Sequence, residues 1–390
     1  MKKLVSMNSQ GIPIASAATT ASRRVRYLSQ NRPGARMGIG HYERLLLEHL
    51  LPVAGEEWEF EITFDGRRAN PPISPGDIAD GIREAATLGF SARRAYRLPW
   101  WLARGLVGAF AGRRPSLYHS LALSFPAPAG APAIYTIHDL PPARFDDEGA
   151  FPAWAKKAVA AAQYIHVPSQ FAADELRELL GIPESKLRVI RYGCECEVFH
   201  PGVPPASVEQ LRRIGIGGPF LVYVGGFTRR KNVAAMLQAW KAVAARFSEI
   251  TLLLVGPGSQ LQRLVSESGA PRAVVAGYLG RDVLPNVVKA SEALVFPSIY
   301  EGFGLPPLEA MAMGVPAIGV NASAVREVVA GAGLLAEDGS ADALEHAMTN
   351  LLDDSALRAK LREAGPKRAA DFDWGRHAGG MLQLYAAAAR

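Results

Sequence analysis

The stretch over residues 293–320 constrains the fold of this chain more than any other. It begins with a short apolar run typical of a buried parallel strand, and a second apolar run follows Gly314. Pro306 and Pro307 are tolerated only in the first turn of a helix, so the helix between the runs begins near Leu305, and Gly314 ends it. The pattern predicts a strand–helix–strand unit of a parallel α/β sheet.

The turn before this helix has the composition of a ligand site. Gly302 and Gly304 let a ligand approach the backbone closely, and the start of a helix favours an anion. Glu301 and Glu309 bracket the same turn, and their carboxylates accept hydrogen bonds from sugar hydroxyls. We therefore predict a site for a sugar joined to a diphosphate. The alternative is that both glutamates are surface residues beside an ordinary crossover.

Strand and helix patterns alternate twice along the chain, whose 390 residues are enough for two domains. We predict a leader that is poorly ordered, a first Rossmann-like domain, a Pro- and Gly-rich linker, a second Rossmann-like domain and a C-terminal helix. In that order, the five segments span residues 1–23, 24–200, 201–218, 219–372 and 373–390.

Charge and cysteine content limit the partners and the compartment. The net charge of +6 and the pI near 9.3 suit nucleotide sugars, anionic lipids or nucleic acid. Cys194 and Cys196 are too close for an easy disulfide and lack the further ligands of a zinc site. No apolar run approaches the roughly 18 residues of a membrane span. These features predict a cytoplasmic chain with no structural metal.

Two predicted strand ends in the first domain carry polar residues. His138 follows the strand at 133–137, and Ser169 follows the strand at 164–167. Side chains at the carboxyl ends of parallel strands face the ligand crevice, although a lone histidine there can equally be structural. Gly38 and Gly40 lie in a strand-to-helix turn, where they either contact a ligand or only form the turn.

The segment 93–114 alternates tryptophan, leucine and arginine. This composition is typical of a helix that lies in a membrane interface, and it also fits a core helix with basic ends.

The central stretch, PSIYEGFGLPPLEAMAMGVP, resembles the nucleotide-sugar signature of retaining glycosyltransferases of family four, and VGGFTRRKN resembles their second diphosphate-binding turn. The resemblance extends over about residues 24–384 and is strongest to members that assemble bacterial surface polysaccharides, many of them mannosyltransferases. It implies the GT-B fold, in which two Rossmann-like domains face a cleft and a C-terminal helix crosses back to the N-terminal domain. The resemblance further implies that the domain at 24–200 binds the acceptor and that the domain at 219–372 binds the nucleotide sugar.

The resemblance also implies roles for individual residues. Arg230 and Lys231 would hold the donor diphosphate without a metal, because fixed cations stabilise charge on the leaving phosphate. Glu301 would bind the donor sugar, Glu309 the ribose, and His138 the transferred sugar. The catalytic group would be His138, Lys231 and Glu301.

Further donor contacts are implied in the same way. Backbone N–H groups would come from Gly302, Phe303, Gly304 and Leu305, Ser169 would line the cleft, and Gly38 and Gly40 would let a loop close over the diphosphate. Glu327 matches an acidic position of the family without a chemical role. Many relatives carry an arginine where this chain has Gly225 and Gly226, so which arginine pairs the phosphate stays open.

The resemblance implies a retaining, metal-independent transfer of a hexose. We expect mannose from GDP-mannose, no cofactor, and a polysaccharide or polyprenyl-diphosphate-linked acceptor on the cytoplasmic face of the membrane. The alternatives are a UDP-glucose-dependent glucosyltransferase or synthase, and an inactive GT-B scaffold. A glycoside hydrolase is disfavoured because its reaction gives Arg230 and Lys231 no role. Nucleic-acid binding is disfavoured because the arginines lie in scattered turns.

Overall fold

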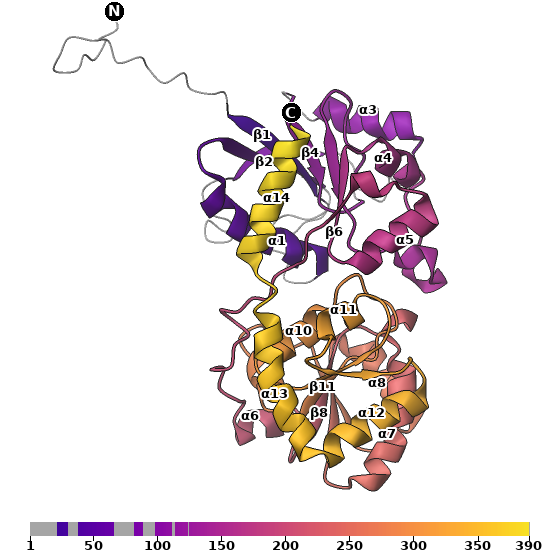
Figure 1. The fold of residues 1–390 in the computed structure, drawn as a ribbon. Coiled ribbons are helices and arrows are strands. Elements are labelled where there is room, and N and C mark those ends of the chain that lie inside the picture. The colour runs from indigo at the N-terminus through magenta and orange to yellow at the C-terminus, as the bar shows by residue number, and fades with distance from the viewer. Residues whose placement is uncertain are drawn as a thin grey trace, which may run out of the picture.

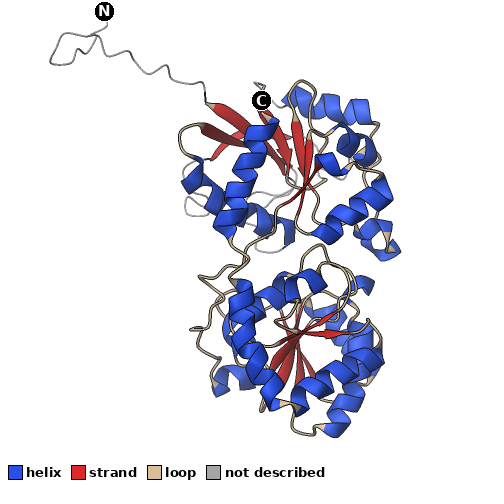
Figure 2. Ribbon diagram, in the orientation of Figure 1, coloured by secondary structure: helices blue, strands red, loops and turns tan. Residues whose placement is uncertain are grey.

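The computed structural model describes residues 22–29, 38–65, 82–88, 98–110, 114–123 and 125–389. The described chain forms two α/β units, one above the other in Figure 1, each with a sheet at its centre and helices around it in Figure 2. The predicted leader lies outside the described residues except for its last two. The domain boundaries drawn from the sequence stay predictions.

The described part of the first unit contains a seven-stranded parallel sheet in the order β3-β2-β1-β4-β5-β6-β7. Its strands are β1 (Arg23–Ser29), β2 (Trp58–Asp65), β3 (Ile82–Leu88), β4 (Leu117–Ser120), β5 (Ala133–Thr136), β6 (Tyr164–Val167) and β7 (Leu187–Val189). Its α-helices are α1 (Gly38–Ala54), α3 (Trp100–Phe110), α4 (Ala155–Ala161) and α5 (Gln170–Leu180), and short 3-10 turns are η1 (Pro141–Ala143), η2 (Asp146–Glu148) and η3 (Glu184–Lys186).

The second unit is built around a six-stranded parallel sheet in the order β10-β9-β8-β11-β12-β13. Its strands are β8 (Phe220–Val224), β9 (Thr251–Val255), β10 (Ala273–Gly277), β11 (Ala293–Val295), β12 (Ala317–Val320) and β13 (Leu334–Ala336). Its helices are α6 (Val208–Arg213), α7 (Val233–Arg246), α8 (Gly258–Ser268), α9 (Leu284–Lys289), α10 (Leu305–Ala312), α11 (Val325–Val329), α12 (Ala341–Asp353) and α13 (Ser355–Ala369), with the 3-10 turn η4 (Arg229–Lys231). The last helix, α14 (Trp374–Ala388), follows α13 at the end of the chain.

The C-terminal helix crosses back, as predicted. In Figure 1, α13 lies on the second unit and α14 lies beside α1 on the first. The Tyr385 hydroxyl on α14 lies 3.1 Å from that of Tyr27 on β1 and 2.9 Å from Nδ1 of His119 on β4. All three residues are buried. The last helix therefore completes the core of the first unit.

No helix within the described ranges has the length and apolar character that would let it cross a bilayer. The segment predicted to touch a membrane, 93–114, contains α3, and its residues 93–97 and 111–113 lie outside the described ranges. Ala103 and Val107 of α3 are fully buried, whereas Trp101 is 72% exposed. One face of α3 therefore packs in the core and the other carries an exposed tryptophan.

Candidate active site

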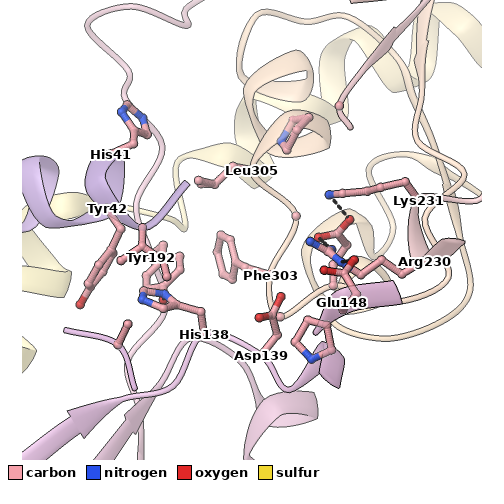
Figure 3. A pocket seen from close by; sticks show the side chains of 18 of the residues that line it. His41, Tyr42, His138, Asp139, Glu148, Tyr192, Arg230, Lys231, Phe303 and Leu305 are labelled. Atoms are coloured by element: carbon pink, nitrogen blue, oxygen red, sulfur yellow. Dashed lines mark hydrogen bonds and ion pairs between the residues drawn. The ribbon is translucent and has the colours of Figure 1, made fainter. Parts of the chain in front are cut away.

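A cavity of about 740 Å³ lies between the two units. The first unit supplies loops that follow β5, and the second supplies the turn after β8 and the start of α10 (Figure 3). Both walls are therefore formed at carboxyl ends of parallel strands, where an open α/β sheet binds its ligands.

Two cations and one carboxylate meet on the wall formed by the second unit. Lys231 Nζ lies 2.6 Å from Glu301 Oε1, and Arg230 Nη1 lies 2.9 Å from Glu301 Oε2. Burial of Glu301 opposes its ionisation, but the charges of Lys231 and Arg230 outweigh burial and lower the pKa of Glu301. The carboxylate is therefore ionised at neutral pH and the two cations are fixed in the cavity.

Arg230 is shared with a second carboxylate from the other unit. Its Nε donates to Glu148 Oε1 at 2.7 Å, and Glu148 belongs to η2. Arg229, the neighbouring arginine of the same turn, is exposed and does not line the cavity. The structure therefore places Arg230 and Lys231, but not Arg229, where a diphosphate could reach them.

Glu309 lines the cavity about one turn into α10. Burial, followed by the nearby charge of Glu195, raises the pKa of Glu309 to about 7. Among the described residues its carboxylate makes no hydrogen bond or ion pair, so it is free to accept a hydroxyl such as that of a ribose.

Glu195, just after β7, binds cations from both units. It contacts His41 Nε2 at 2.7 Å and Arg44 Nη2 at 3.1 Å on α1, and Arg281 Nη1 at 2.7 Å in the loop after β10. Burial opposes ionisation, yet the His41 and Arg281 contacts lower the pKa of Glu195 to about 2. The ion cluster joins the first helix to the second unit beside the predicted ribose position of Glu309.

The turn before α10 presents backbone to the cavity. Gly302, Phe303, Gly304 and Leu305 all line it. Gly304 has a φ of 123°, a conformation that favours glycine. The N–H groups of Phe303, Gly304 and Leu305 donate no backbone hydrogen bond within the described residues, and Pro306 and Pro307 have no N–H to offer. The N–H of Gly302 likewise donates no backbone hydrogen bond among the described residues, so all four predicted donors before the prolines stay available to an anion.

His138 lines the cavity with both ring nitrogens already bonded. The Tyr192 hydroxyl contacts Nδ1 at 2.5 Å, and Nε2 lies 2.8 Å from the Leu121 carbonyl, which can only accept. The ring is therefore protonated on Nε2, and burial lowers the pKa of His138 to about 4. A sugar contact through a ring nitrogen requires one of these hydrogen bonds to be exchanged.

Two residues singled out from the sequence, Ser169 and Glu327, lie at the contact between the units. Ser169 caps α5 and its Oγ donates to the Gly302 carbonyl at 2.8 Å, so it does not line the cavity. The Glu327 carboxylate accepts N–H bonds at 3.1 and 2.7 Å from the first two residues of α5. Glu327, for which the sequence suggested no role, thus joins the second unit to a helix N-terminus of the first.

The glycine-rich turn before α1 is only partly described. Gly38 begins α1 and Gly40 is buried within its first turn, while Ile39 and His41 line the cavity. The loop before Gly38 lies outside the described residues, so the predicted closure of that loop over a diphosphate stays a prediction.

The sequence analysis missed Asp139 and Glu148. Both line the cavity from the first unit, and Figure 3 shows Glu148 beside Arg230 and Asp139 between Glu148 and His138. Asp139 directly follows the predicted residue His138 at a strand end, which was signal enough to select it. Glu148 lies in a loop without any strand-end or glycine signal.

Comparisons with known proteins agree with this geometry. The family model described as glycosyl transferases group 1 matches residues 210–368, and that described as glycosyltransferase family 4 matches residues 60–198. The chain belongs to the group 1 glycosyltransferases of the GT-B fold. The two matches correspond to the two sheets.

Individual relatives are similar over part of their length. O-antigen chain mannosyltransferase B of Escherichia coli is 30% identical over 221 residues, which are 55% of this chain and 58% of the relative. The 2-deoxystreptamine glucosyltransferase of Streptomyces kanamyceticus is 34% identical over 188 residues, 45% of this chain and 48% of the relative. The chain thus spans about half the length of the curated relatives it matches.

The solved structure of sucrose-phosphate synthase from Thermosynechococcus elongatus has a TM-score of 0.71 to this chain. It is 23% identical, and the match covers 94% of this chain and 98% of the synthase. At this identity the similarity establishes the fold alone.

Proposed function

We propose that this protein is a retaining hexosyltransferase that binds a nucleotide sugar in the cavity between its two units. The observation that carries the proposal is the placement of Arg230, Lys231 and Glu301 together on one wall, beside the unbonded N–H groups before α10. Two cations suit a diphosphate, and a fixed carboxylate suits sugar hydroxyls.

In the proposed transfer step, these groups act together on the bound donor. The bond between the anomeric carbon and the β-phosphate oxygen breaks, and Lys231 with Arg230 stabilises the charge that grows on that phosphate. The acceptor oxygen bonds to the same face of the anomeric carbon, and its proton passes to the leaving phosphate. Glu301 orients the sugar. Because the two cations supply the positive charge, the proposed step is independent of a metal.

We favour mannose from GDP-mannose as the donor and a polysaccharide or polyprenyl-diphosphate-linked saccharide as the acceptor. Similarity to the E. coli O-antigen mannosyltransferase supports this choice. Similarity to the 2-deoxystreptamine glucosyltransferase supports a second candidate function for this chain, the transfer of glucose from UDP-glucose. Competition between GDP and UDP for the purified protein separates the two: tighter binding of GDP would support GDP-mannose, and tighter binding of UDP would support UDP-glucose.

A lipid-linked acceptor would bring the enzyme to the cytoplasmic face of a membrane, and α3 is the surface we propose for that contact. Trp101 is exposed on this helix, and Arg104 lies on the same helix with its guanidinium 5.2 Å from the Trp100 ring. Trp101→Ala should weaken sedimentation with vesicles containing anionic phospholipid and leave nucleotide binding unchanged. Equal sedimentation of both proteins would contradict this contact.

The test of the proposed function is direct transfer. GDP-mannose and UDP-glucose are each incubated with the protein and a saccharide acceptor, methyl α-D-mannopyranoside or methyl α-D-glucopyranoside, and release of the nucleoside diphosphate is followed. Lys231→Ala should abolish release, while Arg229→Ala, which removes an exposed charge from the same turn, should not. No release from either donor by the unmodified protein would favour an inactive scaffold.

A further inference from the structure

The wall of the cavity formed by the first unit is acidic. Asp139 follows β5, and Glu148 belongs to η2. In Figure 3 the Asp139 carboxylate points into the cavity between Phe303 and Glu148. Neither residue is needed for the donor contacts described above, so this wall is available to a second substrate.

The Asp139 carboxylate is half-buried and unpaired. Among the described residues it makes no hydrogen bond or ion pair, and the charges that face it are Arg230, Lys231, Glu301 and Glu148. Burial raises the pKa of Asp139 to about 6, and the two neighbouring carboxylates raise it further against the pull of the cations. A carboxylate in this position lacks the hydrogen-bond donors that buried polar groups normally have.

Asp139 lies at the sugar end of the proposed donor site. A Cβ built on Gly302, the residue after Glu301, would lie 3.0 Å from the Asp139 Cβ. Glu301 is the residue proposed to hold the donor sugar. The hydroxyl that attacks the anomeric carbon must enter beside the leaving phosphate, in the space between the two units, and Asp139 lines the first unit's side of that space.

Glu148 reinforces the negative charge once a donor is bound. Its Oε1 accepts a hydrogen bond from Arg230 Nε at 2.7 Å. A diphosphate that binds Arg230 competes for the same guanidinium, which loosens the pair with Glu148. The acceptor would then meet two carboxylates, which attract hydroxyl donors and repel a phosphate.

We propose that Asp139 and Glu148 form the acceptor-binding wall and select an acceptor whose reacting sugar is uncharged over one whose reacting sugar itself carries a phosphate. The proposal rests on the proposed function, because it assigns the second substrate of the same cavity. Asp139 binds the hydroxyls of the acceptor, and Glu148 adds repulsion against a phosphate on the reacting sugar.

The test compares one sugar with and without a phosphate. Release of nucleoside diphosphate from GDP-mannose and UDP-glucose is measured with methyl α-D-mannopyranoside and with mannose 6-phosphate, and again with the glucose pair. Asp139→Asn removes the charge and keeps the size, and Asp146→Asn is the matched control, because Asp146 is an exposed acid in the same loop. Thermal stabilisation by GDP and UDP reports donor binding separately.

The wild type should be stimulated by the uncharged glycoside and not by the phosphorylated sugar. Asp139→Asn should raise the KM for the uncharged glycoside about tenfold, and nucleotide stabilisation should stay unchanged. Stimulation by the phosphorylated sugars, stimulation by none of the four sugars, or equal behaviour of Asp139→Asn and Asp146→Asn would overturn the proposal. Absence of nucleotide binding by the wild type would instead refute the proposed function.

Discussion

Gly302→Ala should open the cleft between the two units. The substitution adds one methyl group to a residue whose φ is outside the left-handed region, so the backbone itself tolerates alanine. The new Cβ would lie 1.7 Å from the His138 carbonyl oxygen and 2.7 Å from its carbon. Both are backbone atoms, so no side-chain rotation can relieve the overlap.

The magnitude follows from this overlap. Contact distances between carbon and oxygen atoms are about 3.3 Å or more, so the 1.7 Å contact with the His138 oxygen requires the two backbones to separate by roughly 1.6 Å. Gly302 and His138 lie on opposite walls of the cavity, and the 2.8 Å bond from Ser169 to the Gly302 carbonyl lies beside them. Misplacing reacting groups by about 1 Å can cost about 100-fold in rate, so we expect a loss of at least that size in transfer.

The assay combines three measurements on Gly302→Ala and on the control Gly217→Ala. A Cβ on Gly217 meets no atom within 4 Å. Transfer should fall only in Gly302→Ala, small-angle scattering should show a larger radius of gyration for it, and nucleotide binding by the second unit should persist. Wild-type transfer and an unchanged radius for Gly302→Ala would refute the reasoning.

Two further perturbations probe single groups. Glu148→Gln removes the carboxylate that competes with a nucleotide for Arg230. Because that competition costs about 1 kcal/mol of binding free energy, GDP or UDP should bind the variant about fivefold more tightly, whereas Asp146→Asn should leave binding unchanged. Weaker binding to Glu148→Gln by isothermal titration calorimetry would contradict this prediction. Burial lowers the pKa of His377 from 6.5 to about 4, so it stays neutral in the folded protein while the unfolded chain takes up a proton as pH falls below 6.5. This proton uptake by the unfolded chain lowers the free energy of unfolding by about 2 kcal/mol between pH 7 and pH 5. Urea unfolding should therefore show His377→Gln gaining about that much relative to wild type over the same range, and a constant difference would contradict the burial argument.

The central stretch could be predicted because its information is local. Glycines, two prolines and flanking apolar runs define a turn and a helix without reference to the rest of the chain. The predicted start of the helix at Leu305 and its end before Gly314 agree with α10. The resemblance to the glycosyltransferases supplied the GT-B fold and the return of the last helix, which the residues alone did not show.

Two strands were not predicted because their sequences lack a strand pattern. β3 (Ile82–Leu88) reads IREAATL, with helix-favouring alanines and a glutamate, and its pairing with β2 outweighs that preference. β4 (Leu117–Ser120) is only four residues long, and it is held between β1 and β5 in the sheet.

The site was only partly predictable because it is formed by two units. Glu301, Arg230 and Lys231 were selected from sequence, but their mutual ion pairs depend on two turns brought together by β8 and β11. Ser169 was expected to line the cleft and instead bonds across the contact between the units. Asp139 follows His138 at a strand end and could have been selected on that ground, but its environment depends on charged groups from both units.

The most direct test of the central claim is thermal stabilisation by GDP, UDP, ADP and their sugar conjugates, measured on the wild type and on Lys231→Ala. The account predicts that one nucleotide and its conjugate raise the unfolding temperature of the wild type, and that the increase disappears in Lys231→Ala but remains in Arg229→Ala. No shift with any nucleotide, or an equal shift in Lys231→Ala, would contradict a diphosphate site at Arg230 and Lys231.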